Sequence, residues 1–131
     1  MRTVNESASR TMPAAASSTP GKVWLVGAGP GAADLLTLRA ARLLAQADIV
    51  LHDALVHPDV LALAPQAIHV PVGKRGGRPS TTQRFINKRL VDAAHRHARV
   101  VRLKGGDPML FGRAQEEIDA LQAAGIAVEV V

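Results

Sequence analysis

The sequence predicts an α/β fold in which helices flank a five-stranded, mainly parallel sheet. Five short apolar runs alternate with four segments of helical pattern, and this alternation is typical of a parallel sheet. Two glycine clusters, at 27–31 and 105–106, directly follow apolar runs. Loops that bind small molecules leave the carboxyl ends of parallel strands in this way.

The first strand is expected at 23–26, and a loop at 27–36 follows it. Thr37 is a good N-cap for a helix over about 37–47. The second strand, 49–52, ends at Asp53, and Pro58 suits the first position of a short helix to about residue 64. The inner face expected for the first helix consists of Leu38, Ala41, Leu44 and Ala45, and the outer face of Arg39, Arg42 and Gln46.

The second half of the chain continues the alternation with a strand at 67–72. Ser80 and Gln83 form a capping box for a helix to about residue 97. A strand at 99–103 and a helix near 113–124 follow, and Gly125 is a good helix stop. The last strand is expected at 126–131. The buried stripe expected for the helix over 80–97 is Phe85, Ile86, Leu90, Val91 and Ala94.

Composition indicates one domain with a tail. The chain has 131 residues, of which 47% are apolar, enough for a core. Residues 1–20 are rich in Ser, Thr, Ala and Pro without periodicity, so we expect a disordered tail and a domain over 21–131. No signal peptide or membrane span is expected, which predicts a cytoplasmic protein. The absence of cysteine excludes disulfide and thiolate chemistry.

The formal net charge of +5 raises the question of an anionic partner. Lys74, Arg75 and Arg78 lie in a glycine-rich loop that could surround carboxylates or phosphates, although a solvated basic loop is the alternative. Nucleic acid is disfavoured because the chain has no Tyr, and Trp24 and Phe85 are expected in the core. The spacing of the five histidines does not favour a metal site.

The first glycine cluster fits a dinucleotide-binding pattern, but the helix expected after it begins only at Thr37. The cluster therefore predicts a loop rather than a turn that grips phosphate. The second cluster offers the bare backbone of Gly105 and Gly106 to a ligand, with the carboxylate of Asp107 beside it. A simple Gly-Gly-Asp-Pro turn is the alternative.

Four motifs occur in order: Val-Gly-Ala-Gly-Pro-Gly at 26–31, Asp-Leu-Leu-Thr-Leu at 34–38, Val-Gly-Lys-Arg at 72–75 and Arg-Leu-Lys-Gly-Gly-Asp-Pro at 102–108. Together they resemble the tetrapyrrole methylases, and most nearly the members that methylate uroporphyrinogen III. The similarity runs over 21–131. It implies that the chain is the N-terminal α/β domain, truncated at its C-terminal end, and that the family's second α/β domain is absent from it.

The resemblance implies transfer of methyl groups from S-adenosylmethionine to two ring carbons of uroporphyrinogen III. The product would be precorrin-2, on the way to sirohaem or cobalamin. It also implies a homodimer, with no metal and no membrane or nucleic-acid partner. The positions that match the cofactor site are Pro30, Gly105, Gly106, Asp107 and Leu110.

The resemblance also gives roles to charged residues. Asp53 matches the family's proposed proton acceptor, with a loop cap as the alternative. Lys74 matches the proposed proton donor, although binding of a substrate carboxylate is the role that we favour. Together with Arg75 and Arg78, Arg113 is a further candidate for the carboxylates of the substrate.

The sequence departs from the family in two places. Ala54 stands where many members carry Arg, and Ala114-Gln115 replaces a Gly-Gly pair. Since the second domain is expected to supply the other wall of the cleft, we expect this chain to be inactive alone. The alternatives are another precorrin methylase and a non-catalytic α/β module that binds an anion or a nucleoside.

Overall fold

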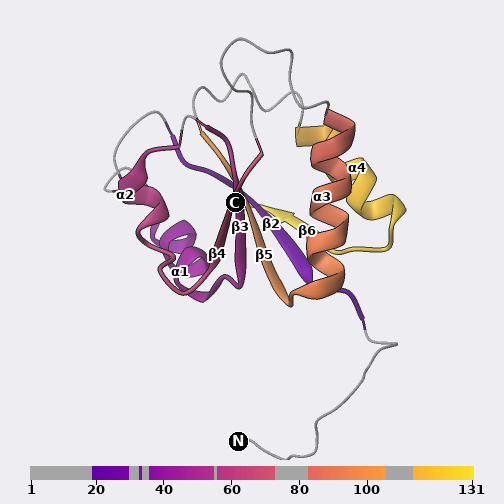
Figure 1. Ribbon diagram of the computed structural model, residues 1–131, viewed down its shortest axis with the longest axis horizontal. Coiled ribbons are helices and arrows are strands. Elements are labelled where there is room, and N and C mark those ends of the chain that lie inside the picture. The colour runs from indigo at the N-terminus through magenta and orange to yellow at the C-terminus, as the bar shows by residue number, and fades with distance from the viewer. Residues whose placement is uncertain (1–18, 30–32, 34–35, 55, 73–82, 106–113) are drawn as a thin grey trace, which may run out of the picture.

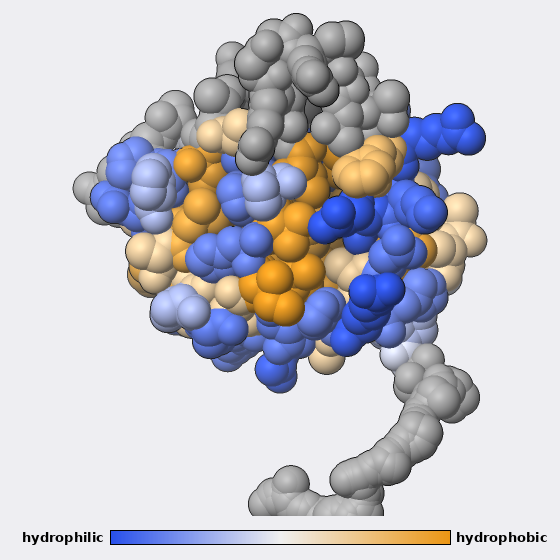
Figure 2. Space-filling view, in the orientation of Figure 1, coloured by the Kyte–Doolittle hydropathy of each residue, from blue (hydrophilic) through white to orange (hydrophobic). Residues whose placement is uncertain are grey.

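Five parallel strands form one sheet in the order β4-β3-β5-β2-β6 (Figure 1). The computed structural model describes residues 19–29, 33, 36–54, 56–72, 83–105 and 114–131, which Figure 2 colours by hydropathy. The parallel sheet predicted from the sequence is confirmed. Its strands are β2 (Lys22–Gly27), β3 (Ile49–His52), β4 (Ile68–Pro71), β5 (Arg99–Lys104) and β6 (Val128–Val130).

Four helices cover the two faces of this sheet. Figure 1 shows α1 and α2 on one side and α3 and α4 on the other. Each pair packs on its own apolar cluster, because side chains of successive strand residues point to opposite faces. In β5, for example, Val100 belongs to the α3–α4 cluster, whereas Val101 and Leu103 belong to the α1–α2 cluster. The helices are α1 (Leu38–Gln46), α2 (Pro58–Leu61), α3 (Gln83–Arg96) and α4 (Ala114–Ala123).

The predicted helix ends are largely confirmed. The Thr37 side chain accepts a hydrogen bond of 3.0 Å from the Ala40 amide and caps α1. Gly125 adopts a φ of 76° directly after α4, a conformation that favours glycine. Helix α2 ends at Leu61, earlier than predicted. Ser80 of the predicted capping box and the predicted tail up to residue 18 lie outside the described residues.

Three of the predicted inner-face residues are wrong, because Leu38, Ala45 and Phe85 are exposed. Leu38 is 76% exposed and Phe85 is 45% exposed. Helix α1 contacts the sheet through a narrow stripe. Its buried residues are Ala40 and Leu44, which lie one helical turn apart. Phe85 lies one helical turn from Arg89, whose guanidinium carbon is 5.7 Å from the ring centroid, so the ring carries a surface cation–π contact. The buried residues of α3 are Ile86, Leu90, Ala93 and Ala94.

None of the helices in the part of the chain that the structure describes has both the length and the apolar character needed to cross a membrane.

Gly21, which precedes β2, yields a stability prediction. An added Cβ would lie 1.9 Å from the His97 carbonyl oxygen and 2.7 Å from that of Ala98, and neither backbone atom can move aside easily. We expect Gly21→Ala to lower the free energy of unfolding by about 1–3 kcal/mol, measured by urea denaturation. The control is Gly125→Asn, which keeps a residue that tolerates positive φ. Equal stability of the two variants would contradict the prediction.

Candidate functional site

The carboxyl ends of β2, β3 and β5 meet at one edge of the sheet, because these strands are parallel and adjacent. Asp53 follows β3, the first glycine cluster follows β2, and Gly105 follows β5. The Ala28 amide donates to the Lys104 carbonyl oxygen at 2.7 Å, and the Asp53 amide donates to the Leu103 carbonyl oxygen at 3.3 Å. The structure therefore places Asp53 and the starts of both glycine loops side by side.

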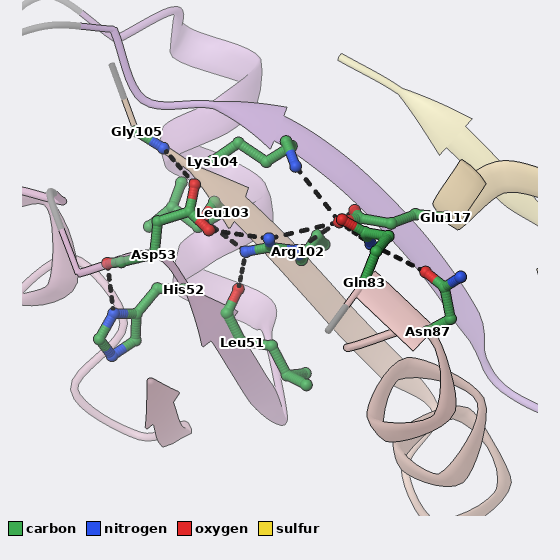
Figure 3. Close-up of polar contacts among 10 residues, drawn as sticks. All are labelled: Leu51, His52, Asp53, Gln83, Asn87, Arg102, Leu103, Lys104, Gly105 and Glu117. Atoms are coloured by element: carbon green, nitrogen blue, oxygen red, sulfur yellow. Dashed lines mark hydrogen bonds and ion pairs between the residues drawn. The ribbon is translucent and has the colours of Figure 1, made fainter. Parts of the chain in front are cut away.

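The Asp53 carboxylate is held through both of its oxygens (Figure 3). Oδ1 lies 2.8 Å from Nη2 of Arg102, and Oδ2 accepts a hydrogen bond of 3.2 Å from the Gly105 amide. The side chain is 24% exposed, so it still faces the solvent side of the edge. A carboxylate in this position can accept a proton or stabilise positive charge on a bound molecule.

Arg102 is fully buried and uses its whole guanidinium group. Nε and Nη2 donate to the two oxygens of Glu117 at 3.2 and 3.3 Å, and Nη2 also contacts Asp53. Nη1 donates to the carbonyl oxygens of Leu51 at 3.5 Å and Leu103 at 3.3 Å. Nε thus has one acceptor, and Nη1 and Nη2 have two each, which matches the five N–H donors of arginine.

Glu117, on α4, is the centre of the buried part of this network and has no exposed surface. Besides Arg102, its Oε2 accepts from Nζ of Lys104 at 3.2 Å and from Nε2 of Gln83 at 3.0 Å. Gln83 in turn donates to Oδ1 of Asn87 at 2.9 Å. Two carboxylates and two cations therefore form a cluster without net charge, in which each buried charge has an opposite neighbour.

The residues predicted to form the site do not include Arg102, Lys104 or Glu117, because the end of β5 reads as part of an apolar run. A signal was nevertheless present. Val100, Arg102 and Lys104 alternate along the strand, so they point to the same face. On α4 the stripe at i, i+3, i+4 and i+7 includes Glu117 among apolar positions. The two cations of β5 and the carboxylate of α4 thus lie at positions where the pattern predicts buried residues, on surfaces that pack against each other. The other members of the helix stripe are Ala114, Ile118 and Leu121.

The glycine backbone at this edge leaves room for a ligand. Gly29 has a φ of 70°, and apart from Gly29 and its chain neighbours no atom of the described residues lies within 4 Å of where its Cβ would be. Gly105 is buried against the strand ends. Bare backbone beside a carboxylate offers polar groups that can orient a small molecule.

Of the residues predicted to form the site, Asp53 and Gly105 are described, and they lie together. The others lie outside the described residues: Pro30, Lys74, Arg75, Arg78, Gly106, Asp107, Leu110 and Arg113.

Three histidines, two in strands and one at the start of α2, have local partners. Nδ1 of His52 lies 3.0 Å from the Asp53 carbonyl oxygen, and Nε2 of His69 lies 2.7 Å from that of Ala64. Nδ1 of His57 accepts from the Asp59 amide and caps α2. Among the residues that the structure describes, no three His, Asp or Glu side chains gather where they could hold a metal ion.

A parallel α/β sheet with a carboxylate and two glycine loops at its carboxyl edge defines the class of small-molecule-binding α/β domains. The family of tetrapyrrole (corrin/porphyrin) methylases matches residues 22–131. The chain therefore belongs to this family.

The relatives give the comparison more detail. A uroporphyrinogen-III C-methyltransferase of Pseudomonas aeruginosa is 55% identical over 111 residues, which cover 85% of this chain and 45% of the relative. The Thermus thermophilus uroporphyrin-III C-methyltransferase with S-adenosylhomocysteine is similar to this structure with a TM-score of 0.73 and 53% identity, over 85% of this chain and 47% of that one. A cobalt precorrin-4 methyltransferase of cobalamin biosynthesis is similar with a TM-score of 0.68 and 32% identity, over 84% and 44%. The chain thus spans about half the length of these relatives.

The charge cluster yields a second stability prediction. Glu117→Leu removes the carboxylate that balances Lys104 and Arg102 in the core. Because a buried charge without its partner is strongly destabilising, we expect a loss of about 3–5 kcal/mol in the free energy of unfolding. The control is Glu116→Leu on the neighbouring exposed position of α4, which should change stability by no more than about 0.5 kcal/mol. Urea denaturation of both variants decides the matter. A Glu117→Leu protein as stable as its control would show that the cluster does not need the carboxylate.

Proposed function

We propose that this chain forms the N-terminal half of an enzyme that transfers methyl groups from S-adenosylmethionine to uroporphyrinogen III and yields precorrin-2. The observation that carries the proposal is the Asp53 carboxylate, fixed beside two glycine loops at the carboxyl edge of a sheet in a member of this family. A carboxylate at this place is suited to proton chemistry on a bound molecule.

The choice of substrate rests on similarity. The identity to a uroporphyrinogen-III C-methyltransferase is 55%, and the identity to a methyltransferase of a later corrin precursor is 32%. The difference favours uroporphyrinogen III over the alternative of another precorrin methylase. The proposal covers sirohaem and cobalamin biosynthesis alike, since precorrin-2 precedes both.

S-adenosylmethionine supplies an electrophilic methyl group on a positively charged sulfur. We assign its binding to Gly105 and to the family positions Pro30, Gly106, Asp107 and Leu110. Gly105 supports this assignment, because its backbone lies next to Ala28 and the first glycine loop. The protein's own task is to hold the methyl group in line with a nucleophilic ring carbon.

Asp53 is assigned to the proton that leaves the macrocycle when a ring carbon gains a methyl group. Each carboxylate oxygen has two lone pairs, and among the described residues one donor contacts each oxygen, which leaves acceptor capacity for a bound molecule. Lys74 is assigned to a substrate carboxylate, and Arg75, Arg78 and Arg113 to further carboxylates. A homodimer, which the family resemblance implies, and a cytoplasmic location stay predictions.

The proposed function predicts that the 131-residue chain alone does not turn over, because half of a cleft leaves cofactor and substrate poorly oriented. We define the joined protein as this chain followed by the part of the Pseudomonas aeruginosa relative that lies beyond the matched region. The joined protein should release dimethylated product, detected by absorbance and mass spectrometry. Calorimetry should show weaker binding of S-adenosylhomocysteine to the chain alone. Steady turnover by the chain alone would refute the first expectation, and a folded joined protein without methyl transfer would refute the proposed function.

Kinetics of the joined protein separate the roles of Asp53 and Lys74. Asp53→Asn should lower kcat by about a hundredfold, the usual contribution of general acid–base help, with little change in cofactor affinity. Lys74→Ala should raise the KM for uroporphyrinogen III more than it lowers kcat. An unchanged kcat in Asp53→Asn would remove Asp53 from the chemistry. A collapsed kcat with unchanged KM in Lys74→Ala would make Lys74 a proton donor instead.

A further inference from the structure

We infer that Arg102 is a positioning residue for Asp53. Its buried guanidinium fixes the plane of the Asp53 carboxylate and, through that carboxylate, the Gly105 amide of the second glycine loop. The inference rests on the proposed function, since orientation of Asp53 matters for methyl transfer only where a substrate meets this carboxylate.

The first step is that, without the two partners of its side chain, the carboxylate of Asp53 would be free to rotate. Asp53 follows the last residue of β3, and its side chain is partly exposed, so neither the strand nor the core fixes it. Its two described partners, Arg102 and the Gly105 amide, contact different oxygens and come from the same strand end. Two contacts on different oxygens fix the carboxylate plane, which one contact would not do.

The second step is that Arg102 is itself immobile. The side chain of Arg102 is 2% exposed, and its Nε and Nη2 donate to the two carboxylate oxygens of Glu117. The carbonyl oxygens of Leu51 and Leu103 hold Nη1 on the opposite edge of the group. The path from α4 to the site is therefore a series of contacts, from Glu117 to Arg102, from Arg102 to Asp53, and from Asp53 to Gly105 (Figure 3).

The third step is that stability alone does not explain Arg102. Buried ion pairs stabilise poorly compared with apolar side chains of the same volume, because their charges lose water. Lys104 already balances Glu117 at 3.2 Å, and Gln83 adds a neutral donor to the same carboxylate. Arg102 differs from both in one respect, because among the described side chains that contact Glu117 it alone also reaches Asp53.

Arginine suits this task better than lysine. Its planar fork offers five donors in fixed directions, whereas a lysine ammonium offers three donors from one point. Nη2 contacts both Glu117 and Asp53, and Nε donates to the other oxygen of Glu117. Nη1 donates to two backbone carbonyl oxygens. The shorter side chain and single ammonium of a lysine at position 102 could pair with Glu117 or with Asp53, but not with both.

The kinetic test compares Arg102→Lys and Arg102→Met with Lys104→Met in the joined protein, each at a temperature where circular dichroism shows complete folding. Lys104→Met removes a buried cation from the same strand and the same carboxylate without removing a partner of Asp53. We expect both Arg102 variants to lose about a hundredfold in kcat, the scale of a misplacement of about 1 Å, with a much smaller loss in Lys104→Met. Equal losses in the three variants would reduce Arg102 to a structural residue.

A second readout uses the 131-residue chain and needs no catalysis. The Gly105 amide is hydrogen-bonded to Asp53, so its hydrogen exchange, followed by NMR, reports whether Asp53 is held. We expect exchange at Gly105 to be about tenfold faster or more in the Arg102 variants. Arg99→Met, an exposed position of the same strand, is the control and should leave this rate unchanged.

The two readouts separate the inference from the proposed function. Unchanged Gly105 exchange in both Arg102 variants would overturn the positioning role, whatever the joined protein does. Faster exchange at Gly105, beyond that of other amides of β5, would support it even if the joined protein methylates nothing, which would overturn the proposed function alone.

Discussion

The contact between Glu117 and Arg102 is the interaction on which the arrangement of the candidate site depends. Two cations on the inner face of β5 would be costly in an apolar core, and the helix carboxylate makes their burial acceptable. Once buried, Arg102 extends to the end of β3 and meets Asp53. The site is thus built outward from the core, and the packing of α4 against the sheet decides where a carboxylate at the edge points.

The fold itself could be predicted because it depends on local patterns. The alternation of strands and helices, the cap at Thr37 and the stop at Gly125 are properties of neighbouring residues, and each is found where the sequence places it. The inner faces of α1 and α3 are only partly as predicted. The position of Asp53 follows from the same logic. A residue directly after a strand in a parallel sheet must lie at the carboxyl edge, beside the ends of the strands that flank it.

The partners of Asp53 were harder to predict, because they depend on register. Arg102 can reach Asp53 because the register of β3 and β5 places Arg102 beside Leu51, two residues before Asp53. Glu117 can reach Arg102 because α4 packs against this part of β5. No pattern among neighbouring residues predicts the strand register or the packing of this helix. Phe85 is a different case, since it lies exposed on α3 beside Arg89, and its apolar character alone predicted burial. The roles of the loop residues from 73 to 82 and from 106 to 113 stay predictions.

The strand order has a consequence for how the chain folds. Strands β2 and β3 follow each other in the sequence, but β5 lies between them, in register with Lys22 at one side and Ile49 at the other. Until residues 99–104 are available, the first strands have an empty place between them and cannot close the sheet. Such distant pairing slows folding, and the central strand cannot join the sheet until residues 99–104 have been synthesised. Because that same strand carries Arg102, Asp53 can meet its arginine partner only after β5 has taken its place between β2 and β3.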